Sequence, residues 1–295
     1  MERPSRVMPF IPMSKSTHYV PDRPSSVSQA LEQASLALQA QRPDEAERLA
    51  AGVLRADRSN ITAARVLATA LLVQGRADEA IHPLQRAARR SQDPAIETLL
   101  ARALAAIGRK DEALDQLRET IGRRPPFPQA FLELGDQLSA MGRFEEGAAV
   151  FESGVALMPD ALVLRVGLGY LNLQRNDRAQ ARTLFLRVRA EAPGRIDALV
   201  GLARVMTLDG DYAEAAELYR KVLEVRPSDA ATRIELGKCL LEMGKRDAGA
   251  ATLCAATQGS AELSGPATMA LATASHGRFF LRRSAAAKYL RGNAN

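Results

Sequence analysis

The sequence is poor in several features that mark particular classes of protein. It has no tryptophan, only 4% of its 295 residues are aromatic, and it contains two cysteines. No apolar run approaches the roughly 18 residues that span a membrane, and residues 1–26 lack the apolar core of a secretory signal. These absences argue against an integral membrane protein and against a secreted domain held by disulfides. We therefore expect a cytoplasmic protein with buried free thiols at Cys239 and Cys254.

Motifs for catalysis or metal binding are also missing. His18, His82 and His276 show no ligand spacing, and no HExxH, phosphate-loop or nucleophile-elbow motif occurs. Pairs of acidic residues recur, but each pair falls in the first turn of an expected helix, where acids interact favourably with the helix dipole. These pairs are Asp44-Glu45, Asp78-Glu79, Asp111-Glu112 and Glu145-Glu146. The sequence thus predicts no catalytic site, no metal site and no cofactor.

The excess of positive charge lies at the two ends of the chain. Of the net charge of +6, residues 1–26 contribute +2 and residues 276–295 contribute +5, so residues 27–275 carry −1. A groove for nucleic acid needs its basic residues on the folded body. We therefore expect no nucleic-acid binding.

A period of 34 residues runs through the sequence. In three successive stretches a small residue is followed 24 positions later by a proline, from Gly135, from Gly169 and from Ala203. Extending this phase gives seven repeats, at residues 27–60, 61–93, 94–127, 128–161, 162–195, 196–229 and 230–263. A period of this size indicates repeats that stack on one another to bury a continuous core.

Fixed positions within each repeat indicate two closely packed helices. Positions 8 and 20 hold only alanine or glycine, although 53 alanines and 20 glycines make up only about a quarter of the chain. Helices can cross at close range only where the side chains are this small. Position 15, mostly glycine, suits a helix end, and position 24 carries larger apolar groups. The position-8 residues are Ala34, Ala68, Ala101, Gly135, Gly169, Ala203 and Gly237, and from the second repeat on the position-24 residues are Leu84, Leu117, Phe151, Phe185, Tyr219 and Leu253.

This pattern resembles the tetratricopeptide repeat family over residues 27–263. The resemblance implies an all-α fold, a right-handed superhelical α-solenoid of antiparallel helix-turn-helix repeats with a concave groove. The tryptophan that the family often carries at position 4 is absent. Two specialisations of the family are not matched. Its chaperone-tail clamp would need asparagine where Thr69 stands, and position 6 lacks the asparagine ladder of its glycosyltransferase arms.

The segments outside the repeats receive separate expectations. Residues 1–26 are rich in proline and serine and should be disordered, with Met1, Met8 and Met13 as candidate starts of translation. Residues 264–295 are predicted to form capping helices and a basic tail. The basic helix within residues 276–295 has a second interpretation, weak contact with a membrane surface.

Positions 2, 5, 9 and 12 of the first helices form one stripe, which lines the concave groove in the family that the chain resembles. The middle of the stripe is apolar, and basic residues flank it. This combination predicts a protein ligand, a peptide or helix with an apolar face and some acidic residues. The candidate groove residues are Arg65, Arg102, Leu132, Asp136, Val163, Val166, Tyr170, Val200, Arg204, Ile234 and Lys238.

The leading hypothesis is a non-catalytic scaffold or adaptor that binds a protein segment in this groove. The alternatives are an accessory arm of a separately encoded enzyme, such as a transferase, and a membrane-surface assembly factor. An enzyme in its own right is disfavoured, because residues 1–26 and 264–295 are too few for a catalytic domain. The sequence gives no indication of the oligomeric state.

Overall fold

The computed structural model describes residues 26–258, 263–277 and 283–290, and these residues form sixteen helices and no strand. The predicted all-α solenoid of paired helices is confirmed. The helices fall into two compact units, an N-terminal unit that ends at Gly75 and a C-terminal unit that begins at Arg76. The disorder expected for residues 1–26 concerns residues that lie, apart from Ser26, outside the described ranges.

The N-terminal unit consists of α1 (Ser26–Gln39), α2 (Pro43–Ala56) and α3 (Ile61–Val73). Each of these helices packs on the other two. Their common core is built mainly from alanine, with Ala34 and Ala46 fully buried. The small side chains let the three helix backbones lie close together.

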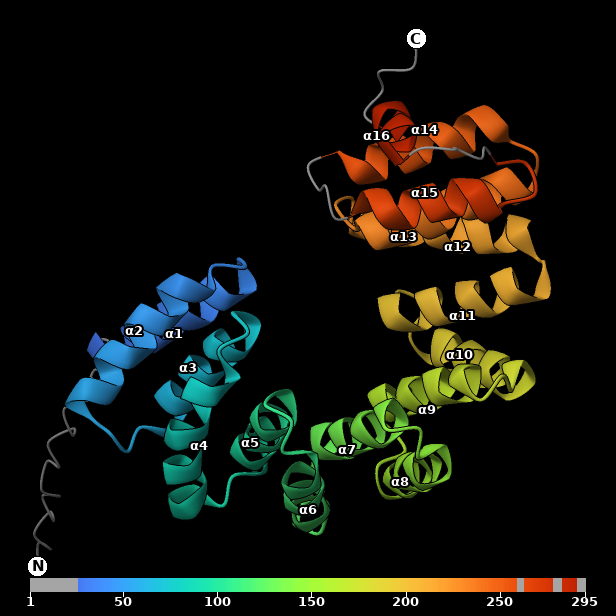
Figure 1. Ribbon diagram of the computed structural model, residues 1–295. Helices are drawn as coiled ribbons and strands as arrows, with labels where there is room; N and C mark the ends of the chain where they lie inside the picture. The colour runs from blue at the N-terminus through green and yellow to red at the C-terminus, as the bar shows by residue number, and fades with distance from the viewer. Residues whose placement is uncertain (1–25, 259–262, 278–282, 291–295) are drawn as a thin grey trace, which may run out of the picture. The chain divides into compact units, whose positions relative to one another are not determined.

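The C-terminal unit continues the pattern as a series of helix hairpins (Figure 1). Its first helices α5, α7, α9, α11 and α13 begin at the residues where repeats begin in the sequence. The helices are α4 (Ala77–Ser91), α5 (Pro94–Ala106), α6 (Lys110–Ile121), α7 (Pro128–Ala140), α8 (Phe144–Leu157), α9 (Leu162–Gln174), α10 (Arg178–Glu191), α11 (Ile196–Asp209), α12 (Tyr212–Val225), α13 (Ala230–Glu242), α14 (Arg246–Thr257), α15 (Ser264–Thr273) and α16 (Arg283–Leu290).

Local chemistry explains where these helices begin and turn. Aspartates precede α5, α10 and α13, and each accepts a hydrogen bond from a backbone amide of the first turn at 2.9–3.1 Å. The hairpins turn at left-handed residues, with φ of 86° at Gly108 and 75° at Gly142. Only glycine adopts this conformation freely. Asn176, which tolerates it better than most residues, holds the same place in the α9–α10 hairpin with φ of 60°.

First helices also pack on first helices. Close contacts join α5 with α7, α7 with α9, and α9 with α11, in addition to the contacts within each hairpin. Figure 1 shows α6 and α8 on the same side of the row formed by α5, α7 and α9. The other face of these first helices is therefore left uncovered by second helices, and this uncovered face is the one on which a binding site can lie.

Aromatic rings held between pairs of glycines organise the core of the C-terminal unit. Phe185 of α10 is fully buried, and a Cβ added at Gly169 or Gly201 would lie 2.8 or 2.4 Å from its ring. The two glycines belong to the successive first helices α9 and α11, so the ring fills the space where these helices approach. Phe151 stands in the same way between Gly135 and Gly167.

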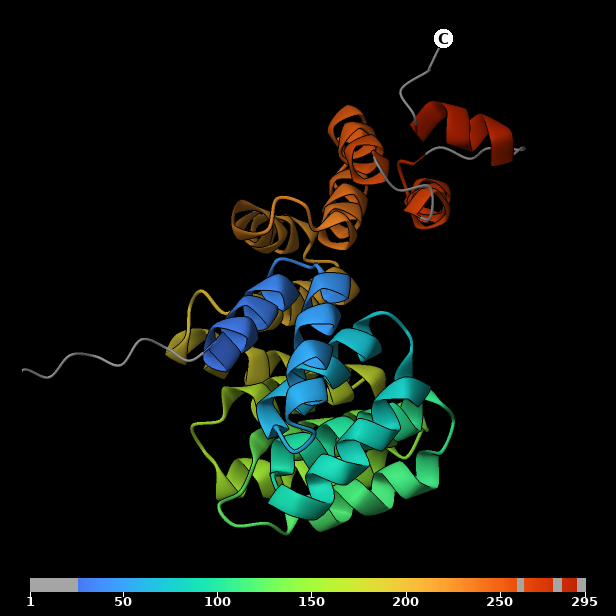
Figure 2. The ribbon, with the colours of Figure 1, turned by 90° about the vertical axis from the view of Figure 1, so that its left-hand side faces the viewer.

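The last two helices cover the end of the repeat series. α15 packs on α13 and α14, and α16 lies beside α14 and α15 (Figure 2). Leu271 and Leu290 are each only 1% exposed, and the Thr257 hydroxyl donates a hydrogen bond to the Leu290 carbonyl oxygen at 3.2 Å. These contacts favour the capping role proposed for residues 264–295. Part of the basic helix expected within residues 276–295, including Phe279 and Phe280, lies outside the described residues.

Gly201→Ala should destabilise the protein, although alanine is the better helix former. The added methyl group would lie 2.4 Å from the Phe185 ring, and overpacking of this kind costs about 1–3 kcal/mol. Phe185→Leu combined with Gly201→Ala should recover part of the loss, because it removes the ring atoms that clash. Urea unfolding followed by circular dichroism measures both effects.

Gly52→Ala provides the matched control. Gly52 also lies inside a helix, α2, but a Cβ added there would meet only the end of the Arg55 side chain at 3.9 Å. We expect this change to stabilise the protein by about 0.5–1 kcal/mol. If Gly201→Ala were stabilising to the same degree, the tight fit around Phe185 would be wrong.

Candidate functional site

The residues predicted to line the groove all lie on first helices, but in two separate units. Arg65 is an exposed residue of α3 in the N-terminal unit. The remainder belong to the C-terminal unit, with Arg102 on α5, Leu132 and Asp136 on α7, Val163, Val166 and Tyr170 on α9, Val200 and Arg204 on α11, and Ile234 and Lys238 on α13.

The apolar part of the stripe serves mainly to pack the helices. Val166 and Ile234 are only 4% and 6% exposed, so their prediction as accessible groove residues is wrong. Position 5 faces a neighbouring helix wherever the helices lie close together, and Val166 accordingly joins the core cluster around Phe185. Leu132, Val163 and Val200 are half-buried and pack against the edges of core clusters.

The cations of the stripe differ in how they are paired. Arg102 forms an ion pair with Glu133 at 3.2 Å, and Lys238 forms one with Glu235 at 3.0 Å. Arg204 is exposed, and its guanidinium makes no hydrogen bond or ion pair with any described residue. Among the described stripe cations of the C-terminal unit, Arg204 is therefore the one that has its full hydrogen-bonding capacity available for a ligand.

Tyr170 lies at the centre of the uncovered face and is fixed at both ends. Its hydroxyl donates a hydrogen bond to the carbonyl oxygen of Asp197 at 2.8 Å. Its ring meets the Phe185 ring edge-on, with the ring centres 5.2 Å apart. Burial raises the pKa of Tyr170 to about 12, so the hydroxyl stays protonated and keeps its role as a donor.

Two acidic side chains share the α7 part of this face. Asp136 is exposed to solvent, but it is surrounded by much protein and stands near the Glu133 carboxylate. Loss of hydration, followed by repulsion from Glu133, raises the pKa of Asp136 to about 6. Near pH 6 this group is therefore about half ionised, and a bound cation would favour its ionised form.

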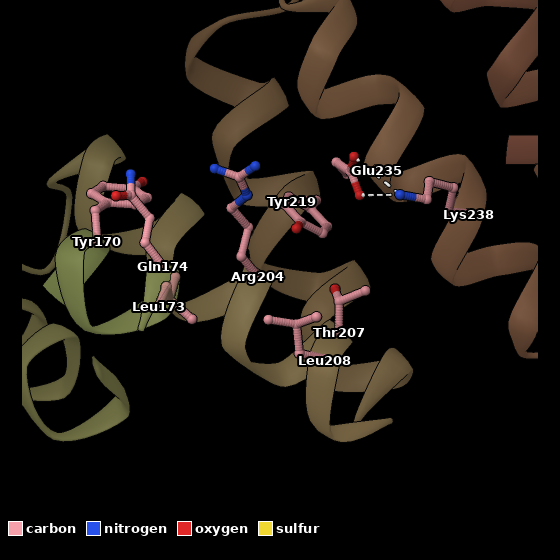
Figure 3. Close-up of a pocket in the computed structure, with 9 residues that line it drawn as sticks. All are labelled: Tyr170, Leu173, Gln174, Arg204, Thr207, Leu208, Tyr219, Glu235 and Lys238. Atoms are coloured by element: carbon pink, nitrogen blue, oxygen red, sulfur yellow. Dashed lines mark hydrogen bonds and ion pairs between the residues drawn. The ribbon is translucent and has the colours of Figure 1, made fainter. Parts of the chain in front are cut away.

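Two cavities lie side by side along α9, α11 and α13, with Tyr170 lining both. The first has a volume of about 400 Å³ and includes Arg204 and Thr207 of α11. The second has a volume of about 490 Å³ and includes Asp197 and Val200 near the beginning of the same helix. Figure 3 shows the first cavity, with Arg204 between Tyr170 on one side and Tyr219 and Glu235 on the other.

The first cavity also contains residues that the groove prediction did not include. Gln174 and Leu208 form part of its rim, Tyr219 of α12 lies deeper, and Glu235 of α13 faces Arg204. Leu208 is 57% exposed and adds an apolar group to the rim. The one sequence signal for Tyr219 was its hydroxyl, because from the second repeat on the other position-24 residues are leucine or phenylalanine.

Within the described ranges, no group of three or more His, Cys, Asp or Glu side chains could hold a metal ion. Both cysteines are free thiols; Cys239 is buried as expected, whereas Cys254 is only half-buried, and loss of hydration raises the pKa of both. A raised pKa disfavours the nucleophilic thiolate at neutral pH. The described helices are also too short or too polar for any of them to cross a lipid bilayer.

Models of known protein families match much of the chain. Two models described as Tetratricopeptide repeat match residues 98–161 and residues 138–205 and 206–258, and together they span more than half of the 295 residues. A model described as Anaphase-promoting complex, cyclosome, subunit 3 matches residues 39–120. Protein CTR9 homolog of Arabidopsis thaliana is 35% identical over 83 residues, which are 28% of this chain and only 8% of that protein.

Solved structures share the fold at low sequence identity. A tetratricopeptide repeat protein from Parabacteroides merdae has a TM-score of 0.60 at 16% identity, over 83% of this chain and 98% of that one. Human IFIT1 with m7Gppp-AAAA has a TM-score of 0.65 at 15% identity, over 83% and 63% of the two chains. The APC/C hetero-tetramer Cut9-Hcn1 has a TM-score of 0.60 at 15% identity, over 90% and 56%.

At such identities the structural likeness establishes the fold, and the family models add the repeat signature in the sequence itself. Both agree with the repeats of paired helices seen in the structure. The chain belongs to the tetratricopeptide repeat family.

Proposed function

We propose that the protein is a non-catalytic scaffold that binds a segment of another protein on the uncovered face of α9, α11 and α13. The observation that carries this proposal is the pair of adjoining cavities around Tyr170. The cavities lie on α9, α11 and α13, whose other sides pack into the core. The exposed Leu208 and the unpaired Arg204 line the first cavity. Arginine is enriched at protein interfaces, and the buried centre of an interface is more apolar than its rim.

The charges on this face suggest the chemistry and direction of the bound segment. Acidic groups lie on α7, at Glu133 and Asp136, whereas Arg204 lies further along the chain on α11. A complementary segment would place an acidic side chain near Arg204, apolar side chains in the cavities and a basic side chain near Asp136. Complementary charges of this kind fix the orientation of a partner and exclude others.

The comparisons support a protein partner in general terms. Cut9-Hcn1 is a hetero-tetramer of proteins and shares this fold. IFIT1 shares it too and was solved with m7Gppp-AAAA, so the fold alone does not decide the class of ligand. The charge of −1 over residues 27–275 favours protein over nucleic acid for this chain.

Arg204→Glu combined with Leu208→Glu should abolish partner binding without unfolding the protein. Both side chains are exposed, and Arg204 makes no bond that the change would break. Quantitative co-purification from native extract should show partner recovery reduced by about tenfold or more, as expected when a charge at an interface is reversed.

Leu186→Glu combined with Arg187→Glu is the matched control. These are the same substitutions, made on exposed positions of the second helix α10. Partner recovery should equal that of the wild type. If the two double variants lost partners equally, or if neither lost them, binding on the first helices would be disproved.

Asp136→Asn should stabilise the free protein at pH 7.5 and have little effect at pH 4. The pKa of Asp136 is raised to about 6 from 3.8, so folding favours its protonated form, and that contribution is lost as pH rises from about 4 to 6. The asparagine variant does not undergo this loss. Its thermal midpoint, measured by scanning calorimetry between pH 4 and pH 7.5, should exceed that of the wild type by a margin that grows with pH.

Glu133→Gln tests the cause of this pH dependence. Loss of hydration is the larger cause of the raised pKa of Asp136, and repulsion from Glu133 is the smaller one. Removing the Glu133 carboxylate removes only the repulsion, so stability should still change with pH, but less than in the wild type. If Asp136→Asn raised the midpoint equally at every pH, ionisation of Asp136 would not be the reason. If Asp136→Asn stabilised the free protein and also weakened partner binding, Asp136 would be identified as a binding residue.

A further inference from the structure

The first cavity occurs where the glycine pairing of the core is interrupted. Tyr219 occupies on α12 the position that Phe185 occupies on α10. Phe185 is flanked by Gly169 and Gly201. At the corresponding positions, Tyr219 is flanked by Ala203 and Glu235. Unlike α9 and α11, the helices α11 and α13, both fully described, are not among the closely packed helix pairs. The cavity lies between them, with Tyr219 in its wall.

The Tyr219 hydroxyl is a buried polar group without a hydrogen bond. The whole residue is 0% exposed, and its hydroxyl oxygen has no hydrogen-bond partner. Thr207 is near enough to lower its pKa slightly, but the Thr207 oxygen, which donates its proton to the Ala203 carbonyl oxygen at 2.8 Å, does not meet the geometry of a hydrogen bond with the Tyr219 hydroxyl. Burial raises the pKa of Tyr219 well above its usual value, so the hydroxyl keeps a proton to donate. Buried polar groups are rarely left in this state.

Arg204 supplies a second unsatisfied group in the same cavity. Two cations line it, and Lys238 is already paired with Glu235 at 3.0 Å. The Arg204 guanidinium stands beside Tyr219 (Figure 3) and is not bonded to any described residue. A ligand reaches the buried Tyr219 hydroxyl only when neighbouring side chains move, and no hydrogen bond holds the Arg204 side chain in place.

The remaining lining limits the ligand further. Leu173 and Leu208 provide an apolar wall, and the volume of about 400 Å³ corresponds to on the order of a dozen water molecules. Arg204, Lys238 and Glu235 together carry one net positive charge. A group with a single negative charge matches this balance, whereas the Glu235 carboxylate disfavours a doubly charged group such as a phosphate monoester.

We propose that this cavity is a subsite for one acidic side chain of the bound protein segment, with its carboxylate held between the Arg204 guanidinium and the Tyr219 hydroxyl. The proposal rests on the function proposed above and names the residue type that the segment must carry. Arg204 forms a two-point contact with the carboxylate, the Tyr219 hydroxyl gains its missing acceptor, and Leu173 and Leu208 cover the methylene groups of the side chain.

A stability measurement on the free protein tests the state of the Tyr219 hydroxyl. Tyr219→Phe removes a polar group that has no partner, so the thermal midpoint should rise by a few degrees. Tyr170→Phe is the control, because it removes a hydroxyl bonded to Asp197 at 2.8 Å and should lower the midpoint. A fall in the midpoint for Tyr219→Phe would mean that the hydroxyl is satisfied within the protein, and it would overturn the proposal.

A binding measurement tests the subsite directly. Short random peptides displayed on phage are selected on the immobilised full chain, and the dissociation constant of the best peptide is measured by fluorescence anisotropy. We expect a recurrent Glu or Asp whose replacement by Gln or Asn weakens binding about 10–100-fold. In Arg204→Gln that replacement should have almost no further effect, and Tyr219→Phe should weaken binding of the acidic peptide alone.

Arg102→Gln is the matched control for Arg204→Gln, because Arg102 also lies on a first helix but is already paired with Glu133. It should leave the preference for an acidic residue intact. Peptides that bind without a recurrent acidic residue, or whose acidic residue is insensitive to Arg204, would overturn this subsite and leave the proposed function standing. The absence of any peptide sensitive to Arg204→Glu with Leu208→Glu would overturn both.

Discussion

The structure depends on how closely two successive first helices can approach around one side chain of the second helix between them. At Phe185 the approach is close because Gly169 and Gly201 leave room for the ring, to the point that a single methyl group would collide with it. Close-packed interiors feel changes as small as one methylene. Around Phe151 and Phe185 the spacing of the first helices is therefore set locally, by the fit of one ring between two backbones.

The candidate site arises where this fit is relaxed. Around Tyr219 the flanking residues are Ala203 and Glu235, and α11 and α13 are separated enough to leave a cavity. Tyr219 and Glu235 also bring polar groups into the cavity, namely the Tyr219 hydroxyl and the Glu235–Lys238 ion pair. An unsatisfied buried hydroxyl destabilises the free protein. A partner that satisfies it would recover that energy on binding, which links the irregularity of the core to the proposed function.

The sequence was sufficient to predict the fold because the repeat period and the small residues at position 8 report the helix crossings directly. It was less informative about the site. Helical periodicity places Val166 and Ile234 on the stripe with Arg204, but it does not contain the helix spacing that buries the first two and exposes the third. The glycines at position 6, Gly167 and Gly201, have no meaning until the rings of Phe151 and Phe185 are seen against them. Tyr219 looked like an ordinary core residue because the sequence does not show the cavity beside it.

Site-specific photo-crosslinking in living cells would test the central claim, that the face of α9, α11 and α13 binds a protein segment. A photoreactive phenylalanine analogue would replace Gln174, an exposed residue at the rim of the first cavity, or Glu217, an exposed residue of the second helix α12. The account predicts a discrete crosslinked partner from position 174 and none from position 217. Crosslinks from position 217 alone, or equally from both, would contradict it.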